Sequence, residues 1–190
     1  AIKASPLGRD IVTPIVYDGF GRQTRDYLPI PQSSTTNGTI YTQSTGLMNY
    51  PVSDPTNIYL SEKIYSEKVL ESSPLERVLQ QVQVGNDWTN KPINFEYDTN
   101  VASEVLKFVT STIWTNNATS SDLKLDAINK FYQANQLYKN KVTDEDGNAS
   151  IEFKNGQGQT LLVRKNDGVN DVDTYYVYND YDQLAYVIPP

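Results

Sequence analysis

The segment Tyr17-Asp18-Gly19-Phe20-Gly21-Arg22 lies between two strand-like runs, 13–17 and 23–28, and weakened copies of it recur along the chain. Its Asp and Gly residues favour a tight turn, and the flanking β-branched and aromatic residues favour strands. A repeated strand–turn–strand unit usually builds a scaffold and seldom builds a reaction centre. The pattern therefore predicts an all-β fold of antiparallel hairpins. Matched by spacing, the copies are 5–9, 73–77, 144–148, 155–159 and 179–183.

Length and composition bound the size of the fold and its partners. With 190 residues the chain can bury a core, either as one domain or as one segment of a larger protein. We therefore treat 1–190 as a single domain or segment, and we expect it to be excised from a longer polypeptide. The net charge of −7 argues against nucleic acid as a partner, because phosphate binding needs a basic patch. No apolar run approaches the roughly 20 residues of a membrane span.

The chain has no Cys and no His, which limits its chemistry. Disulfides, thiolate nucleophiles, zinc sites built on Cys or His, and His-based acid–base relays are excluded. The sequence also lacks a Gly-x-Ser-x-Gly elbow, a phosphate-binding loop and an HExxH helix. We therefore expect no enzymatic activity, no catalytic residue and no cofactor.

The last third carries the clearest structural pattern. Gly, Asn and Asp clusters separate five short strand candidates there, which predicts an antiparallel meander over 136–188. The segments 95–98 and 103–114 also look extended, whereas 115–122 reads as a polar loop. A high content of Ser, Thr, Asn, Gly and Pro predicts a long surface loop over about 32–57. The strand candidates of the meander are 136–142, 149–153, 160–164, 174–178 and 184–188.

Two interpretations compete after position 71. Ser73-Pro74-Leu75-Glu76 forms a helix-start signature, and apolar residues then follow at helical spacing. The same residues match the turn at 5–9, after which no helical period follows. We favour a turn followed by a strand, and a short helix near 74–83 remains the alternative.

The turn residues are best explained as structural. Asp18 and Arg22 could be taken for a catalytic carboxylate and a positioning cation, but Asp in such a turn usually hydrogen-bonds to its own backbone. Gly21 would supply a positive φ, and Arg22 would lie on the outgoing strand and pair with a neighbouring carboxylate. The residues expected to fix the register of the hairpins are Tyr17, Asp18, Gly21, Arg22, Asp144, Gly147, Gly158 and Tyr178.

Metal and glycan ligands have less support from the sequence. Asp144-Glu145-Asp146 departs from the spacing of a calcium-binding EF-hand loop. The oxygen-rich segment 167–173 is more simply a solvated hairpin loop, so no metal ligand is assigned. Trp88 and Trp114 could form a stacking platform for a glycan, although aromatic residues in strands more often pack on sheet faces.

Several longer stretches carry a family resemblance. The core at 17–22 resembles the YD repeat of RHS-repeat proteins. With further stretches in the same order, the chain looks like the N-terminal domain, of unknown function, of the RHS-repeat-associated core proteins of the Bacteroidota. Glu76 and Asp182 replace Gly21 in later copies of the turn, and Asn148, Gln159 and Gln183 replace Arg22. The stretches that carry the resemblance are 10–22, 72–78, 85–88, 143–148, 173–178 and 186–190.

The resemblance implies a location and a role. Such proteins are large, secreted or surface-located, and often exported by the type IX system. Their YD repeats coil a β-sheet into a hollow shell that can enclose a C-terminal toxin or effector, and this domain would start or plug the wall. No toxin segment lies within these 190 residues.

We therefore expect a non-catalytic structural segment that builds or caps a curved β-sheet, part of a larger RHS-like shell, outside the cell or on its surface. Its partners would be the remainder of its own polypeptide, together with secretion-system or surface components. The alternative is a surface adhesion or glycan-binding module that uses Trp88, Trp114 and the loop 32–57.

Overall fold

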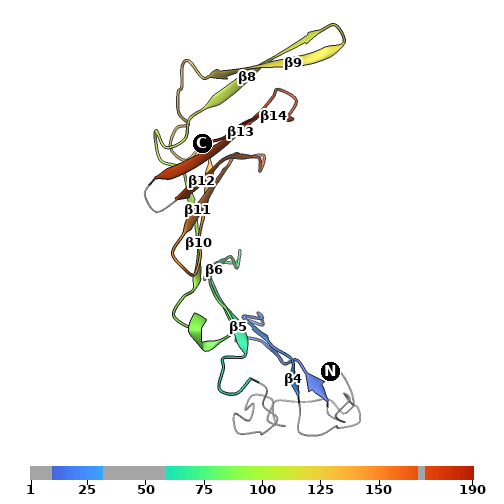
Figure 1. Ribbon diagram of the computed structural model, residues 1–190, viewed down its shortest axis with the longest axis vertical. Helices are drawn as coiled ribbons and strands as arrows, with labels where there is room; N and C mark the ends of the chain where they lie inside the picture. The colour runs from blue at the N-terminus through green and yellow to red at the C-terminus, as the bar shows by residue number, and fades with distance from the viewer. Residues whose placement is uncertain (1–9, 32–58, 167–169) are drawn as a thin grey trace. The chain divides into compact units, whose positions relative to one another are not determined.

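The computed structural model of the protein describes residues 10–31, 59–166 and 170–190 (Figure 1). These residues form antiparallel β-sheets, and the helical element among them is the short 3₁₀ turn η2 (Asn86–Trp88). The all-β prediction is therefore confirmed. Within these ranges no helix has the length and apolar character needed to cross a membrane. The expected turn at 5–9 and the expected loop at 32–57 lie outside the described residues.

The chain divides into two compact units, which we call unit 1 (Ala1–Pro92) and unit 2 (Ile93–Pro190). In unit 1 the strands pair in the order β2-β3-β5-β6, and β1 pairs separately with β4. Cross-strand ion pairs support this register, since Arg25 lies 2.7 Å from Glu67 and Lys68 lies 2.8 Å from Asp26. The strands of unit 1 are β1 (Ile11–Val12), β2 (Ile15–Val16), β3 (Arg25–Tyr27), β4 (Ile30–Pro31), β5 (Tyr65–Leu70) and β6 (Val78–Val82).

The alternative of a helix near 74–83 is wrong. A turn occupies Ser73-Pro74-Leu75-Glu76, and β6 follows it and pairs antiparallel with β5. The Ser73 hydroxyl accepts the N–H of Leu75, so this side chain stabilises the turn and does not cap a helix. Two of the apolar residues that fit a helical period instead pair with the neighbouring strand β5, Val78 with Leu70 and Val82 with Glu67. Tertiary pairing thus overrides a local helix signal.

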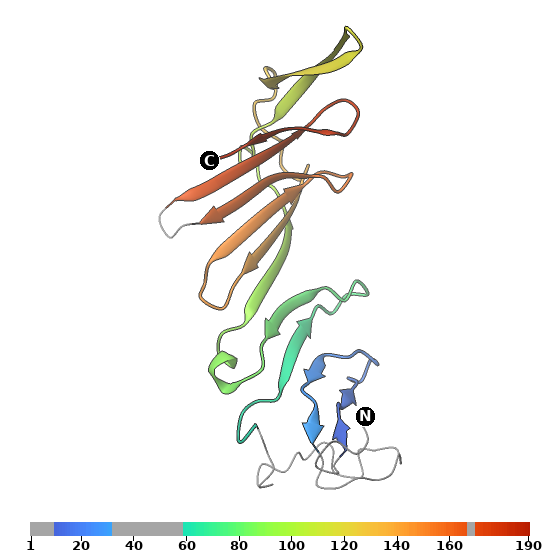
Figure 2. The same cartoon turned by 45° about the vertical axis from the view of Figure 1, so that its right-hand side comes forward.

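Unit 2 is built on one antiparallel sheet with strand order β7-β10-β11-β12-β13-β14. Figure 2 shows β10 to β14 following one another side by side as a meander. The predicted five-strand meander over 136–188 is therefore confirmed, with β13 beginning three residues earlier than the candidate 174–178. The strands of this sheet are β7 (Ile93–Thr99), β10 (Tyr138–Thr143), β11 (Ala149–Lys154), β12 (Thr160–Asn166), β13 (Asp171–Tyr178) and β14 (Leu184–Ile188).

The segment between β7 and β10 contains a second hairpin, β8 (Phe108–Thr115) and β9 (Ala118–Leu125). The prediction of a polar loop over 115–122 is therefore wrong, since only Asn116 and Asn117 connect the two strands. Both residues have positive φ, 52° and 59°, as a tight type I′ hairpin turn requires. The Ser and Thr residues of β9 are mostly exposed, so the strand carries little of the apolar alternation that reveals a half-buried strand.

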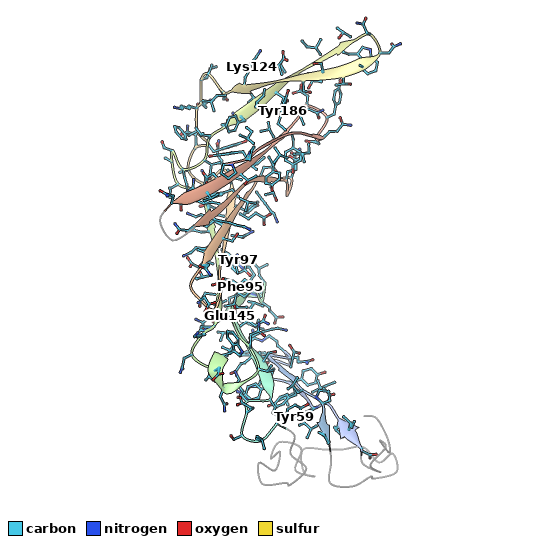
Figure 3. All side chains as sticks on the ribbon, viewed as in Figure 1. Tyr59, Phe95, Tyr97, Lys124, Glu145 and Tyr186 are labelled. Atoms are coloured by element: carbon cyan, nitrogen blue, oxygen red, sulfur yellow. The ribbon has the colours of Figure 1, made fainter. Side chains whose placement is uncertain are left out.

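The core of unit 2 lies between its sheet and the connecting segments. Phe153 and Leu162 project from neighbouring strands and pack with Val105 and Leu137, and all four are at most 2% exposed. The β8–β9 hairpin also contacts the sheet, because the Phe108 ring packs edge-on against Tyr175 at 5.1 Å. The hydroxyl of Tyr186, labelled in Figure 3, donates to the carbonyl oxygen of Ser121 in β9.

Candidate functional site

The hairpin turns predicted from the sequence share one geometry at four places. In each, the first residue's N–H donates to the carbonyl of the fifth, and the fourth residue's N–H donates to the carbonyl of the first, over 2.9–3.1 Å. The fourth residue has positive φ, so each turn is a type I turn followed by a left-handed residue. We call this arrangement the shared turn and number its positions one to five. The shared turns are 18–22, 144–148, 155–159 and 179–183.

The first residue of the shared turn holds it with its own side chain. Oδ1 of Asp18 accepts the N–H groups of Phe20 and Arg22, each at 2.9 Å. The other three turns repeat both bonds with Asp144, Asn155 or Asn179 in the first position. Asp and Asn are the side chains that reach their own backbone two residues on, which explains why the turns begin with one or the other.

The first and fifth side chains also bond to each other. The Arg22 guanidinium lies 2.8 Å from Oδ2 of Asp18. In the other turns an amide takes the place of Arg22, and the pairs are Asn148 with Asp144, Gln159 with Asn155, and Gln183 with Asn179. The sequence departures from Arg22 therefore keep a side chain that bonds to position one.

Hydrogen bonding lowers the pKa of both turn carboxyls. For Asp18 the main cause is the backbone N–H of Arg22, and the Arg22 guanidinium adds to it. For Asp144 the side-chain amide of Asn148 is the main cause, followed by the Asn148 N–H. A carboxyl with a lowered pKa whose oxygens are occupied within its own turn is suited to holding the backbone, and unsuited to accepting a proton at neutral pH.

The turn at 73–77 is a variant. Glu76 donates its N–H to the Ser73 carbonyl at 3.1 Å and has a φ of 51°. Glu71, which precedes this turn, supplies the carboxylate that stabilises it. Both oxygens of Glu71 accept hydrogen bonds from the Arg77 guanidinium at 2.8–3.0 Å. These bonds, with a further one from the Ser73 hydroxyl, lower the pKa of Glu71 to about 2.

The remaining predicted turn residues lie in the shared turns or directly before them. Gly21, Gly147 and Gly158 hold the fourth position, with φ of 79°, 90° and 83°. Tyr17 precedes the first shared turn and is 62% exposed. Tyr178 ends β13, and its carbonyl accepts the Thr110 hydroxyl at 3.3 Å.

The two tryptophans of the predicted glycan platform lie in different units of the chain, and the loop 32–57 lies outside the described residues. Trp88 lies in η2 of unit 1, is 40% exposed and has the Lys91 ammonium 5.9 Å from its ring centroid. Trp114 lies in β8 of unit 2 and is 66% exposed. A separate cleft of about 170 Å³ in unit 2 is lined by the aromatic residues Phe108, Tyr132 and Tyr175, among others.

The oxygen-rich segment 167–173 takes a different role in its described part. Asp171 and Asp173 belong to β13, and Asp173 accepts two hydrogen bonds from the Arg164 guanidinium at 2.7 and 2.8 Å. Asp171 lies 3.7 Å from the same guanidinium. Among the described residues, no group of three or more acidic side chains is placed to hold a metal ion.

Sequence reasoning missed two features of this region. Asn100 is buried and holds the segment that leads into β10, and nothing in its local sequence marks it. The amide of Gln159 reaches a second turn and donates to Oδ1 of Asp182 at 3.3 Å. The sequence did contain a sign of this second contact, because Asp182 stands at the turn position where three other copies carry glycine.

Comparison with known families gives one match. The family model described as "Domain of unknown function (DUF6443)" matches residues 1–101, just over half of the 190 residues. No curated protein and no solved structure matches the chain. This match supports the resemblance to a domain of unknown function. The chain belongs to the DUF6443 family of domains of unknown function.

Proposed function

We propose that this chain is a non-catalytic structural segment of a large secreted or cell-surface RHS-repeat protein. Its hairpins build or cap a β-shell that encloses a C-terminal toxin or effector. The partners of the segment are the other parts of the same polypeptide. The proposal rests on the family resemblance in the sequence and on the repeated geometry of the turns.

The observation that carries the proposal is the shared turn. Four copies fix four hairpins with the same backbone bonds, and the side chains at positions one and five bond within each turn. In the two turns that begin with Asp, the Asp18 and Asp144 carboxylates accept backbone N–H groups of the turn. Such repetition suits a wall built from successive strands, because register is set at every turn.

The edge of the sheet in unit 2 also suits a wall. β14 is the last strand in the order, so its second edge has no paired strand among the described residues. Leu184 and Val187 on this strand are each 51% exposed. Open edges with apolar side chains favour pairing with another strand, and proteins that work alone usually protect them.

The test is the size of the protein in its source. Intact mass and peptide mapping of the secreted material should give a polypeptide far larger than 21.4 kDa, with peptides that continue beyond these 190 residues. Negative-stain microscopy of that polypeptide should then show hollow shells. A secreted product of 190 residues that works alone would overturn the proposal.

A second candidate is glycan binding at the cell surface. Its support is the exposed ring of Trp114 and the separate cleft lined by aromatic residues, since aromatic faces stack well on apolar faces of ligands. A glycan array with the intact chain, Trp114→Ala and Tyr132→Phe tests it. Saturable binding lost only in Trp114→Ala would assign the platform to β8, whereas no binding by the intact chain would remove this candidate.

A further inference from the structure

Neighbouring hairpin turns contact each other through the same two positions. In unit 2 the side-chain amide of Gln159, at position five of one shared turn, donates to the carboxylate of Asp182, at position four of the next. In unit 1 the Arg22 guanidinium, also at position five, lies 4.0 Å from the carboxylate of Glu76. Glu76 and Asp182 both occupy the left-handed position of their turns.

This contact accounts for the two residues that replace glycine. A left-handed conformation is strained for residues other than glycine, and Glu76 and Asp182 adopt it with φ of 51° and 60°. Asp182 supplies a hydrogen-bond acceptor to the turn before it, and Glu76 supplies an opposite charge to the Arg22 guanidinium. The turns that carry Gly21 and Gly158 are the donors in these pairs, and their own left-handed position needs no side chain.

Gln183 occupies the same position in its turn as Gln159, and no further turn lies beside it among the residues that the structure describes. Both lie at position five and directly precede a strand, and the Oε1 of each accepts an amide N–H from position one. The Nε2 of Gln159 has Asp182 as its acceptor. For the Nε2 of Gln183 there is no acceptor among the residues that the structure describes, and the strand that follows it is β14, whose outer edge is unpaired there.

We propose that a further antiparallel hairpin pairs with the outer edge of β14, and that the turn of this hairpin has a defined residue pattern. Its turn has Asp or Asn at position one and Asp or Glu at position four, and that carboxylate accepts the Nε2–H of Gln183. The inference rests on the proposed function and extends it, because it specifies the turn of the next hairpin in the wall. The argument for this occupant is continuity with the contact between Gln159 and Asp182.

A synthetic hairpin of residues 171–188 serves as the probe, since it carries the required turn with Asp182 at position four. Closing its open ends with a cyclising turn preorganises it. The control hairpin carries Asp182→Gly, which tolerates the left-handed conformation and removes only the carboxylate. Each hairpin is titrated into the isotope-labelled 190-residue chain, and NMR shifts and amide exchange are followed along β14.

We expect the Asp182 hairpin to shift β14 resonances and to slow exchange of its outward-facing amides. The Asp182→Gly hairpin should bind roughly tenfold more weakly, because a charge-assisted hydrogen bond is lost. In the chain, Gln183→Glu keeps an oxygen that accepts from Asn179 but removes the donor. It also places a second carboxylate against that of the probe, so it should weaken binding of the Asp182 hairpin by roughly tenfold or more. With the control hairpin, Gln183→Glu should add no further loss.

Two results would overturn this inference. Equal affinity of both hairpins would show that β14 accepts a strand without the carboxylate contact, which leaves the proposed wall intact. No change along β14 with either hairpin would remove the docking edge itself. The proposed function is then judged separately, by the mass of the polypeptide in its source.

Discussion

Asn100 and Leu137 meet through a buried hydrogen bond, in which the Leu137 N–H donates to Oδ1 of Asn100 over 2.8 Å. The same oxygen accepts from the Gln136 N–H at 3.0 Å, and the amide nitrogen donates to the carbonyls of Gln133 and Val101. Asn100 is 1% exposed. One side chain thus satisfies four backbone groups and ties the end of β7 to the start of β10.

Asn100→Ala should destabilise the protein by about 2–4 kcal/mol, because it removes the side-chain partner of the buried Leu137 N–H and of three part-buried backbone groups. Urea unfolding followed by circular dichroism measures the change. Asn129→Ala is the control, since Asn129 is exposed in the same connecting segment, and it should change stability by less than about 0.5 kcal/mol. Equal effects of the two variants would contradict the assigned role of Asn100.

Gly21→Val should cost roughly 1–3 kcal/mol, because it forces a β-branched residue into a positive φ of 79°. Gly19→Val is a matched control in the same turn. A side chain at either glycine meets no atom within 4 Å, but only Gly21 has a left-handed φ. Thermal unfolding should separate the two variants, and an unchanged melting temperature for Gly21→Val would rule out the shared turn at 18–22.

Asn117→Gly should stabilise the β8–β9 hairpin by about 0.5 kcal/mol, because glycine relieves the left-handed strain at the second turn residue. Asn117→Val should act in the opposite direction, by about 1–2 kcal/mol, because a β-branched residue resists this conformation. Amide exchange rates of the hairpin residues measure the local change in stability in both variants. A slower exchange in the Val variant would contradict the type I′ turn.

Acid should weaken the turn at 73–77 through Glu71. Hydrogen bonds from the Arg77 guanidinium, and then from Ser73, lower the pKa of Glu71 from 4.5 to about 2. A carboxyl with a lowered folded-state pKa contributes stability above its unfolded pKa, and this contribution is lost as the pH falls through 4.5 toward 2. Thermal unfolding should therefore depend less on pH over this window in Glu71→Gln than in the unmodified chain. Identical pH profiles would exclude the contribution of Glu71.

The hairpins of the meander could be predicted because their signals are local. Asp144 and Asn155 begin turns whose glycine follows three residues later, and strands with apolar residues flank them. The strand β9 could not be recognised in this way, because its exposed Ser and Thr residues carry no apolar alternation. Its pairing with β8 decides its conformation.

Hydrogen bonds that side chains make to residues far away in the chain could not be predicted from local sequence patterns. Gln159 and Asp182 lie in different turns, and their contact depends on the pairing of β12 with β13. Asn100 likewise acts through residues more than 30 positions away along the chain. Sequence patterns give the type of an element more readily than they give the partners of a polar side chain.

The central claim is that these hairpins form part of a larger β-wall, and cryo-electron microscopy of the polypeptide purified from its source tests it most directly. We expect the outer edge of β14 to be hydrogen-bonded to a following strand, within a closed shell. A structure in which that edge faces solvent in the intact polypeptide would contradict the account.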